Sequence, residues 1–507
     1  MWKKIGWLGE KLCFGFGVLF ALIVVVQATL TACQGGAYAA LFFLGLGGMG
    51  ALTVAGLRFL RPFPAFPIAL FSLRFLIALG VILIFGAQPV QDFQTMYEAA
   101  CQIAKGSREY LQNEYFYNWA YQTGFVAYEA GVIRLFGENL LPLQLLNALW
   151  MAGTGCLVYG IAKRFLSETT AMTVSLLYAL YPAPYFLAAV LTNQHIATFF
   201  YYLGFWLLVR KKKLTFAEGM LAGLSLSVGN VMRPLGVVIV LALLCWAVVR
   251  MCRWKGQGVL RAGGLLLAAA VVYFISSEFF SWLVRTSGLN PEGLSNNLPM
   301  WKFVLGFNLA SGGAWNQGDY NAYYLLPRGQ AGPEMAEVVK ERISSLGFAG
   351  FLELFWKKSQ TMWGSLEYLY WGFGHLDGNA GILGGITLSQ CLNSLNYFDR
   401  GVFVLAFALA AWALAFYFRK GVQDGASLPV MLGFLLCGYY SVHLLIEVQA
   451  RYRYFLMPVV FLLAGAGAEW LFSWWKSWRA NGRAKDKPAV VRMGAAVEEN
   501  IKNGKPS

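Results

Sequence analysis

The sequence predicts an all-α polytopic membrane protein with about 12 transmembrane helices. Of its 507 residues, 58% are hydrophobic and 13% are charged, whereas soluble domains carry about 25% charged residues. Apolar runs close to the roughly 20 residues that cross a hydrocarbon core recur along the chain. The net charge of +15 comes from basic residues in short connections beside these runs, where such residues set membrane topology. A nucleic-acid partner is therefore not expected.

The apolar runs predict the spans in order. We expect them at about residues 12–32, 37–57, 66–87, 140–161, 171–191, 195–209, 217–231, 234–250, 262–284, 401–418, 428–446 and 453–472. The stretch 217–250 is divided because a single helix of that length would be roughly 50 Å long, at about 1.5 Å per residue. Pro234 lacks a backbone donor and disfavours helical geometry in the residue before it, so we place the break at Arg233–Pro234.

The basic residues predict the orientation, because lysine and arginine concentrate in short cytoplasmic loops. With the N-terminus in the cytoplasm, the strongly basic connections all fall on that side: 58–61, 163–164, 210–213, 250–261 and 419–420. We therefore expect both termini in the cytoplasm, a membrane domain at 1–472 and a flexible basic tail at 473–507.

Two long segments, about 88–139 and 285–400, face outward in this topology. Both are rich in aromatic residues, so we expect them to carry interfacial helices. In the second, the spacing of residues 349–371 predicts an amphipathic helix on the membrane surface, and a thirteenth span is the alternative. The expected apolar stripe is Phe351, Phe355, Met362 and Leu366, with Glu353, Lys357 and Lys358 off it.

Ionisable residues gather at the outward ends of the predicted spans. Asp92 follows the third span, where it either has a chemical role or caps the next helix. Arg233 lies at the predicted break and is either an anion ligand or an interfacial anchor. Together they suggest an outward-facing pocket that binds an anion and moves a proton.

The segment HLLIEVQARYRYFLMP contributes a second group to this pocket. His443, Glu447 and Arg451 are four residues apart and would share one face if the helix continued, with Tyr452 and Arg453 beside them. Ionisable residues at membrane depth are costly and normally face a cavity. The alternative is that Glu447 and Arg451 neutralise each other.

A polar cluster in LTNQHIATFF includes Asn193 and His195, which either form a turn between two helices or face the pocket. Amide and imidazole groups suit sugar hydroxyls and phosphate oxygens. No metal-ligand spacing is present, so no metal residue is assigned, and a divalent cation remains an open alternative.

In their order and placement, these segments resemble the GT-C superfamily of membrane glycosyltransferases, specifically the bacterial group similar to protein O-mannosyltransferases and aminoarabinose transferases (family 39-like). The resemblance covers about residues 66–472. It rests on the QDFQTMYEAA, YPAPYFLAAVLTNQHIATFF, GNVMRPLG and HLLIEVQARYRYFLMP segments.

The resemblance implies a bacterial plasma-membrane enzyme that moves a sugar from a polyprenyl-phosphate donor to an acceptor hydroxyl on the outer face. The acceptor is a polymer, lipid or protein of the cell envelope. Asp92 would be the general base, and Arg233 and Arg451 would hold the phosphate. Members often carry Asp-Glu where this chain has Asp92-Phe93, which leaves open whether a second carboxylate such as Glu98 takes part.

Two other functions are compatible with the sequence. A multi-spanning transporter or lipid flippase would line a path with the same charges, although the chain has no apparent internal repeat. A non-catalytic glycan-assembly subunit would keep the fold without the activity.

Overall fold

The computed structural model describes residues 2–211, 215–253, 257–365, 381–383, 385–422 and 428–485. Within these residues nearly all regular structure is helical, and the two short strands β1 (Gly381–Leu383) and β2 (Ile386–Thr387) pair antiparallel. The predicted all-α class is therefore confirmed.

The twelve longer helices of the described residues include eleven that correspond to predicted spans and one, Ala331–Ser359, that lies in the second segment predicted to face outward. They are α1 (Trp2–Cys33), α2 (Ala39–Phe59), α3 (Phe66–Phe85), α7 (Leu140–Ala162), α10 (Gln194–Val209), α11 (Phe216–Met232), α12 (Gly236–Arg253), α13 (Gln257–Thr286), α16 (Ala331–Ser359), α17 (Leu388–Lys420), α18 (Leu428–Leu445) and α19 (Met457–Lys485). The shorter helices are α4 (Asp92–Ala104), α5 (Glu114–Asn118), α6 (Thr123–Phe136), α8 (Glu168–Ala179), α9 (Ala183–Ala188), α14 (Met300–Gly306) and α15 (Gln317–Asp319). Short 3-10 or π-helical segments include η4 (Tyr320–Tyr324), η5 (Gln360–Gly364) and η7 (Ala450–Leu456).

Eight helices of the described residues are long and apolar enough to cross a membrane, and α12 is a shorter apolar helix. The chain is a multi-pass membrane protein, while the count of twelve stays a prediction. One predicted span is wrong as a single helix: α8 ends at Ala179 and α9 begins at Ala183. Pro182 and Pro184 explain the interruption, because each removes a backbone donor from the ladder.

The break between α11 and α12 is confirmed. Helix α11 ends at Met232, Arg233 is extended (φ −152°, ψ 121°), and α12 begins at Gly236. Two helices therefore meet at this point, with Arg233 in the connection.

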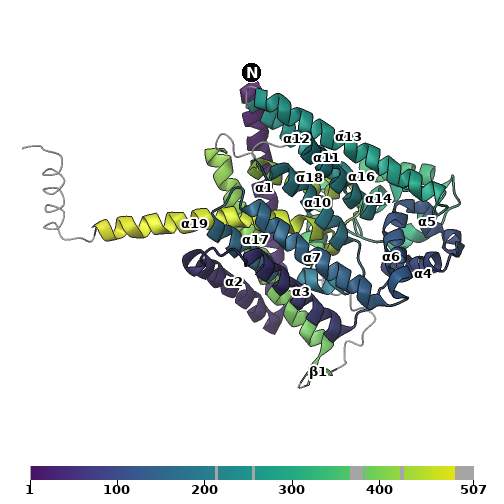
Figure 1. The fold of residues 1–507 in the computed structure, drawn as a ribbon, viewed down its shortest axis with the longest axis horizontal. Coiled ribbons are helices and arrows are strands. Elements are labelled where there is room, and N and C mark those ends of the chain that lie inside the picture. The colour runs from purple at the N-terminus through teal and green to yellow at the C-terminus, as the bar shows by residue number, and fades with distance from the viewer. Residues whose placement is uncertain are drawn as a thin grey trace, which may run out of the picture.

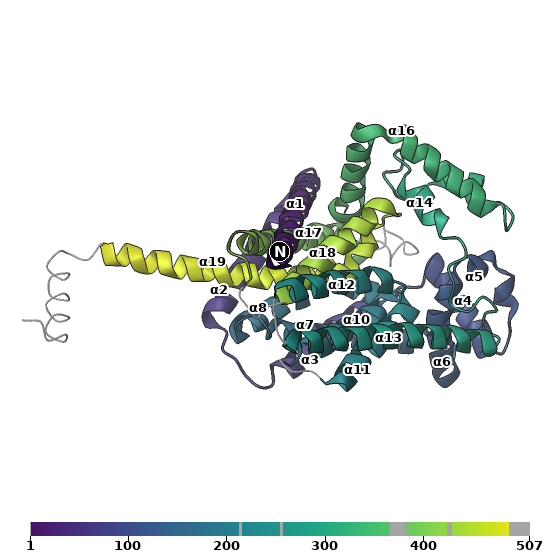
Figure 2. The ribbon, with the colours of Figure 1, turned by 90° about the horizontal axis from the view of Figure 1, so that it is seen from above.

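The membrane helices form one bundle that holds the smaller helices at one end. Helix α17 packs against α1, α2 and α19, while α11 packs against α10 and α13. Both views place α4, α5, α6 and α14 at one end of the molecule, with α19 projecting from the other (Figures 1 and 2). The candidate site described below lies at the end that carries the short helices.

The predicted amphipathic stripe in 349–371 is wrong in part, because Met362 is buried but so is Lys358, which was expected off the stripe. A kink at Gly347 divides α16, and in its second half the buried face includes Leu354 and Lys358 rather than Phe351 and Phe355. This face is buried because α16 packs against α14 and α18, where Lys358 donates to the carbonyls of Gly306 and Leu444 at 2.9 Å each. Leu366 lies outside the described residues, and whether 349–371 crosses the membrane stays a prediction.

The predicted tail is helical at its start, because α19 continues to Lys485. The rest of the tail, 486–507, lies outside the described residues, as do Lys212, Lys213 and Lys255 of the predicted cytoplasmic connections. The flexibility and the cytoplasmic side of the tail stay predictions.

Candidate active site

A cavity of about 1630 Å³ lies between the short helices and the bundle. One side is formed by α4, α5, α14 and η4, and the other by the α11–α12 connection and the α18–η7 connection. Seven of the eight residues that the sequence predicts for the site line this cavity: Asp92, Asn193, Arg233, His443, Glu447, Arg451 and Tyr452. The structure thus brings together four segments that are separated in the sequence.

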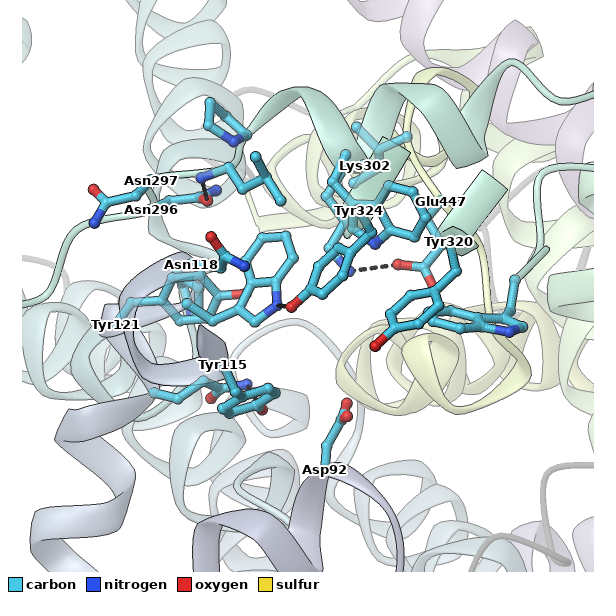
Figure 3. Close-up of a pocket in the computed structure, with 18 of the residues that line it drawn as sticks. Asp92, Tyr115, Asn118, Tyr121, Asn296, Asn297, Lys302, Tyr320, Tyr324 and Glu447 are labelled. Carbon is cyan, nitrogen blue, oxygen red and sulfur yellow. Dashed lines mark hydrogen bonds and ion pairs between the residues drawn. The ribbon is translucent and has the colours of Figure 1, made fainter. Parts of the chain in front are cut away.

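Asp92 is the first residue of α4, and its side chain is 50% exposed. Gln91 occupies the N-cap position, so Asp92 lies in the first turn, where the positive end of the helix dipole stabilises a carboxylate. Gln91 has φ 51°, a left-handed conformation that non-glycine residues adopt at a cost and that clusters at functional sites. The carboxylate points into the cavity toward the space between Tyr115 and Tyr320 (Figure 3).

Arg451 is the charged neighbour of Asp92. One Nη2 to Oδ2 distance of 3.5 Å joins them, while Nε donates to Gln449 at 2.7 Å. The Arg451 guanidinium also lies 4.9 Å from the ring centre of Phe93 and is only 6% exposed. Arg451 is therefore held in place, and one oxygen edge of Asp92 faces the open cavity.

Glu447 connects Arg451 to a lysine from another segment. Its carboxylate pairs with Lys302 of α14, and Gln449 donates to its other oxygen at 2.6 Å. The hydroxyl of Tyr452 donates to the same carboxylate at 3.3 Å. Lys302, Glu447, Gln449, Arg451 and Asp92 thus form a continuous chain of polar contacts along the cavity wall.

The ion pair between Lys302 and Glu447 shifts the pKa of both side chains. Burial alone would raise the pKa of Glu447, but the Lys302 ammonium, Gln449 and Arg451 outweigh it and hold that pKa below its ordinary value. Burial would lower the pKa of Lys302, yet the Glu447 carboxylate outweighs it and raises that pKa. Both groups are therefore charged near neutral pH.

Arg233 differs from Arg451 in its partners. Its Nη1 donates to the Asn193 side-chain oxygen at 3.0 Å, and its guanidinium lies 5.3 Å from the ring centre of Tyr452. Among the described residues no carboxylate pairs with it. Asn193 in turn donates to the Met232 carbonyl at 3.0 Å, which fixes it against the end of α11. Arg233 is thus a half-buried cation at the cavity wall whose hydrogen-bond partner is neutral.

The expected common helical face of His443, Glu447 and Arg451 is wrong. Helix α18 ends at Leu445, and the chain is not helical again until η7 begins at Ala450. The three side chains still reach the cavity because the connection turns there. His443 Nδ1 lies 2.8 Å from the Tyr439 carbonyl, and the residue is 5% exposed.

His195 is the predicted site residue that the structure does not bring to the cavity. It is fully buried in the first turn of α10, with Nδ1 2.5 Å from the hydroxyl of Tyr454. Arg453 also points away from the site, because it donates to the carbonyls of Met362 and Ser365. Neighbours in sequence are thus divided between the cavity and the core.

Glu98, the second carboxylate left open by the sequence, is exposed on α4 outside the cavity wall, and its side chain accepts from Gln94 at 2.8 Å. Sequence analysis missed Lys302. The segment predicted to face outward also contains Lys340, Lys357 and Lys358, so no sequence signal singles out Lys302. No group of three histidine, cysteine, aspartate or glutamate side chains that could hold a metal occurs in the described part of the chain.

A family model described as dolichyl-phosphate-mannose-protein mannosyltransferase matches residues 126–282. The resemblance to GT-C membrane glycosyltransferases is confirmed. The matched region runs from α6 to α13 and includes Asn193 and Arg233. This match supports membrane glycosyltransferase activity in general.

Among solved structures, the chain is similar to the apo oligosaccharyltransferase of Archaeoglobus fulgidus, with 12% identity and a TM-score of 0.44. The similarity covers 86% of this chain and 54% of that one, so the chain spans about half the length of that protein. No curated protein sequence matches the chain significantly.

Proposed function

We propose that the protein transfers a sugar from a polyprenyl-phosphate donor to an acceptor hydroxyl by a single displacement that inverts the anomeric centre. The observation that carries the proposal is the meeting of Asp92 and Arg233 on the wall of one cavity. In the predicted topology this cavity faces outward, and the resemblance implies a bacterial plasma membrane, where lipid-linked sugars and envelope acceptors meet.

Asp92 suits the role of general base. The acceptor hydroxyl attacks the anomeric carbon while its proton passes to the carboxylate, a role that contributes about 10²–10⁴ in rate. The half-exposed position of Asp92 leaves an oxygen open to the acceptor. Arg451, which donates to Gln449 at 2.7 Å, orients the carboxylate through its 3.5 Å contact.

Arg233 suits the role of phosphate ligand. As the bond between the anomeric carbon and the phosphate oxygen breaks, the oxygen keeps the electron pair, and a guanidinium donor stabilises the charge that develops there. Arg233 has no carboxylate partner in the described residues, so its charge is available to an anion. Arg451 is more enclosed, and its contact with Asp92 fits the positioning role better than direct phosphate binding.

Asp92→Asn tests the proposal. We expect transfer of labelled sugar from polyprenyl-phosphate donors to membrane acceptors to fall by about 10²–10⁴, with donor binding and thermal stability unchanged. Glu98→Gln on the same helix is the matched control and should keep full activity.

The same assay separates the rival functions. A transporter or flippase would move the labelled lipid across a vesicle membrane without forming a glycosylated product, and a non-catalytic subunit would do neither. Full transfer by Asp92→Asn would reject Asp92 as the base.

A further inference from the structure

The cavity wall opposite Asp92 carries a connected cluster of aromatic rings. This aromatic wall consists of Trp119, Trp301, Trp315, Tyr320 and Tyr324. Tyr320 and Tyr324 are stacked with ring centres 4.9 Å apart, and Trp301 lies 5.2 Å from Tyr324. Trp315 lies 5.1 Å from Tyr320 and 5.9 Å from Trp301. Trp119 stacks on Tyr324 with ring centres 6.4 Å apart. Every ring of the wall therefore has another ring of the wall as a neighbour.

Part of the wall is buried support, and part faces the cavity. Trp301 and Trp119 are 2% and 7% exposed, whereas Trp315 is 48% exposed and the two tyrosines are half-buried. The indole nitrogen of Trp119 donates to the Tyr324 hydroxyl at 3.2 Å, which fixes that ring. The exposed ring of Trp315 and the half-buried tyrosine rings thus rest on two buried tryptophans.

The segment that carries these rings is held by an ion pair. Arg342 of α16 binds the Asp319 carboxylate with both terminal nitrogens, at 2.7 and 3.0 Å, and Asn308 donates to the same carboxylate at 2.7 Å. Directly after Asp319 the chain forms the π-helical turn η4, a conformation that is rare and frequent at functional sites. The contacts of Asp319 therefore hold the start of η4, which carries Tyr320 and Tyr324, in one conformation.

Amide side chains flank the aromatic wall. Asn118, Asn296 and Asn297 line the same cavity, and the close-up shows them beside Tyr121 and Tyr324 (Figure 3). Amides can both donate to and accept from hydroxyl groups. Asn297 already donates to the Tyr117 carbonyl at 2.9 Å and to Glu292 at 3.3 Å, so the donors come from the other two amides. A pyranose ring has the complementary surface, because C–H groups cover one face and hydroxyls surround its edge. The C–H face stacks on the negative face of an aromatic ring.

We propose that the acceptor is a saccharide, which binds on the aromatic wall with its reacting hydroxyl at Asp92. This assignment rests on the proposed function, which it deepens by naming the acceptor class. The cavity volume of about 1630 Å³ exceeds the roughly 300–1,000 Å³ of common small-molecule pockets, which leaves room for several sugar units beside a donor head group.

The wall fits a saccharide better than a donor sugar or a peptide. The donor sugar is tied to a phosphate, and the cation proposed to bind that phosphate, Arg233, lies on the α11–α12 connection rather than on the wall. Extended peptides are commonly bound along a sheet edge, and the strands β1 and β2 of the described residues do not line the cavity. Stacked rings with flanking amides therefore favour a glycan acceptor.

The test measures binding to glycans without requiring transfer. Detergent-purified protein is applied to an array of bacterial and eukaryotic oligosaccharides printed beside serine- and threonine-containing peptides. The dissociation constant for the strongest oligosaccharide is then measured by saturation-transfer NMR. We expect glycan binding that Trp315→Ala weakens at least about tenfold, while Tyr320→Ala weakens it and Tyr320→Phe restores it.

Trp356→Ala is the matched control, because Trp356 is also 48% exposed but lies on α16 outside the cavity wall. It should change the dissociation constant by less than about twofold. Binding to peptides alone, binding to no oligosaccharide, or equal affinity in wild type and Trp315→Ala would overturn the assignment.

The outcome is separable from that of the proposed reaction. Asp92→Asn should bind the oligosaccharide as wild type does, since stacking does not need the base. Glycan binding without any sugar transfer would reject the reaction and keep the binding surface. Transfer to a protein or lipid acceptor without glycan binding would reject the acceptor assignment alone.

Discussion

Arg233 should give the protein its preference for a phosphorylated lipid over the uncharged alcohol. A hydrogen bond to a charged group contributes about 1.5–3 kcal/mol, and each 1.4 kcal/mol is a factor of ten in affinity. Arg233→Ala should therefore reduce the preference for polyprenyl phosphate over polyprenol by about tenfold to one hundredfold. Arg233→Lys keeps the charge without the forked geometry, so its preference for the phosphate should lie between those of wild type and Arg233→Ala.

The structure predicts that this loss is not a folding defect. Removing Arg233 breaks one hydrogen bond to a neutral amide and leaves Asn193 bonded to the Met232 carbonyl. Arg233→Ala should thus lower the free energy of unfolding by about 1 kcal/mol, which thermal denaturation measures.

The assay compares binding of polyprenyl phosphate and polyprenol to protein in lipid nanodiscs. Arg328→Ala is the control, because Arg328 lines the same cavity but is paired with Glu114 at 2.9 and 3.0 Å near the rim. Because the charge of Arg328 is already compensated by a carboxylate, the control should keep the preference within about threefold. An Arg233→Ala variant that still prefers the phosphate as strongly as wild type would refute the phosphate-binding role.

Two further predictions concern stability. Glu447→Gln should destabilise the protein by about 2 kcal/mol, less than the roughly 3–5 kcal/mol for a fully buried pair because the Lys302 side chain is 30% exposed. Folding lowers the pKa of Glu447, so its contribution to the free energy of unfolding is complete above the ordinary value of 4.5 and is lost as pH falls through the lower folded value. A denaturation series from pH 7 to pH 3 should show this loss of stability in wild type and a smaller loss in Glu447→Gln. Gly347→Ala should cost about 1–3 kcal/mol, because φ 57° and ψ 179° suit glycine while no atom lies within 4 Å of the added carbon. A melting temperature equal to wild type would show that the kink tolerates a side chain.

Local features of the fold could be predicted from the sequence, because they depend on the residues involved. The break at Arg233–Pro234 follows from bilayer thickness and the chemistry of proline. The interruption between α8 and α9 had the same signal in Pro182, but a run of suitable length and hydropathy obscured it. Length and composition find spans more reliably than they find the ends of helices within them.

The face of each side chain was harder to predict, because tertiary packing determines it. Lys358 was expected off the apolar stripe, yet it is buried and donates to the carbonyls of Gly306, Leu444 and Ile446. These carbonyls come from the ends of α14 and α18, so no local pattern around Lys358 could reveal them. The same holds for His195, whose partner Tyr454 is distant in the sequence.

The arrangement of charges explains why the arginines of this cavity, which look alike in sequence, have different roles. Burying a cation is costly unless an opposite charge or several acceptors compensate it. Lys302, Glu447, Arg451 and Asp92 alternate in sign along the wall, so each charge stabilises its neighbour and the chain needs no external ion. Arg233 lies outside this alternation, with an amide and an aromatic face as its described partners. The free cavity therefore carries an excess of positive charge at Arg233, and an anionic leaving group would compensate it where the site has no carboxylate to do so.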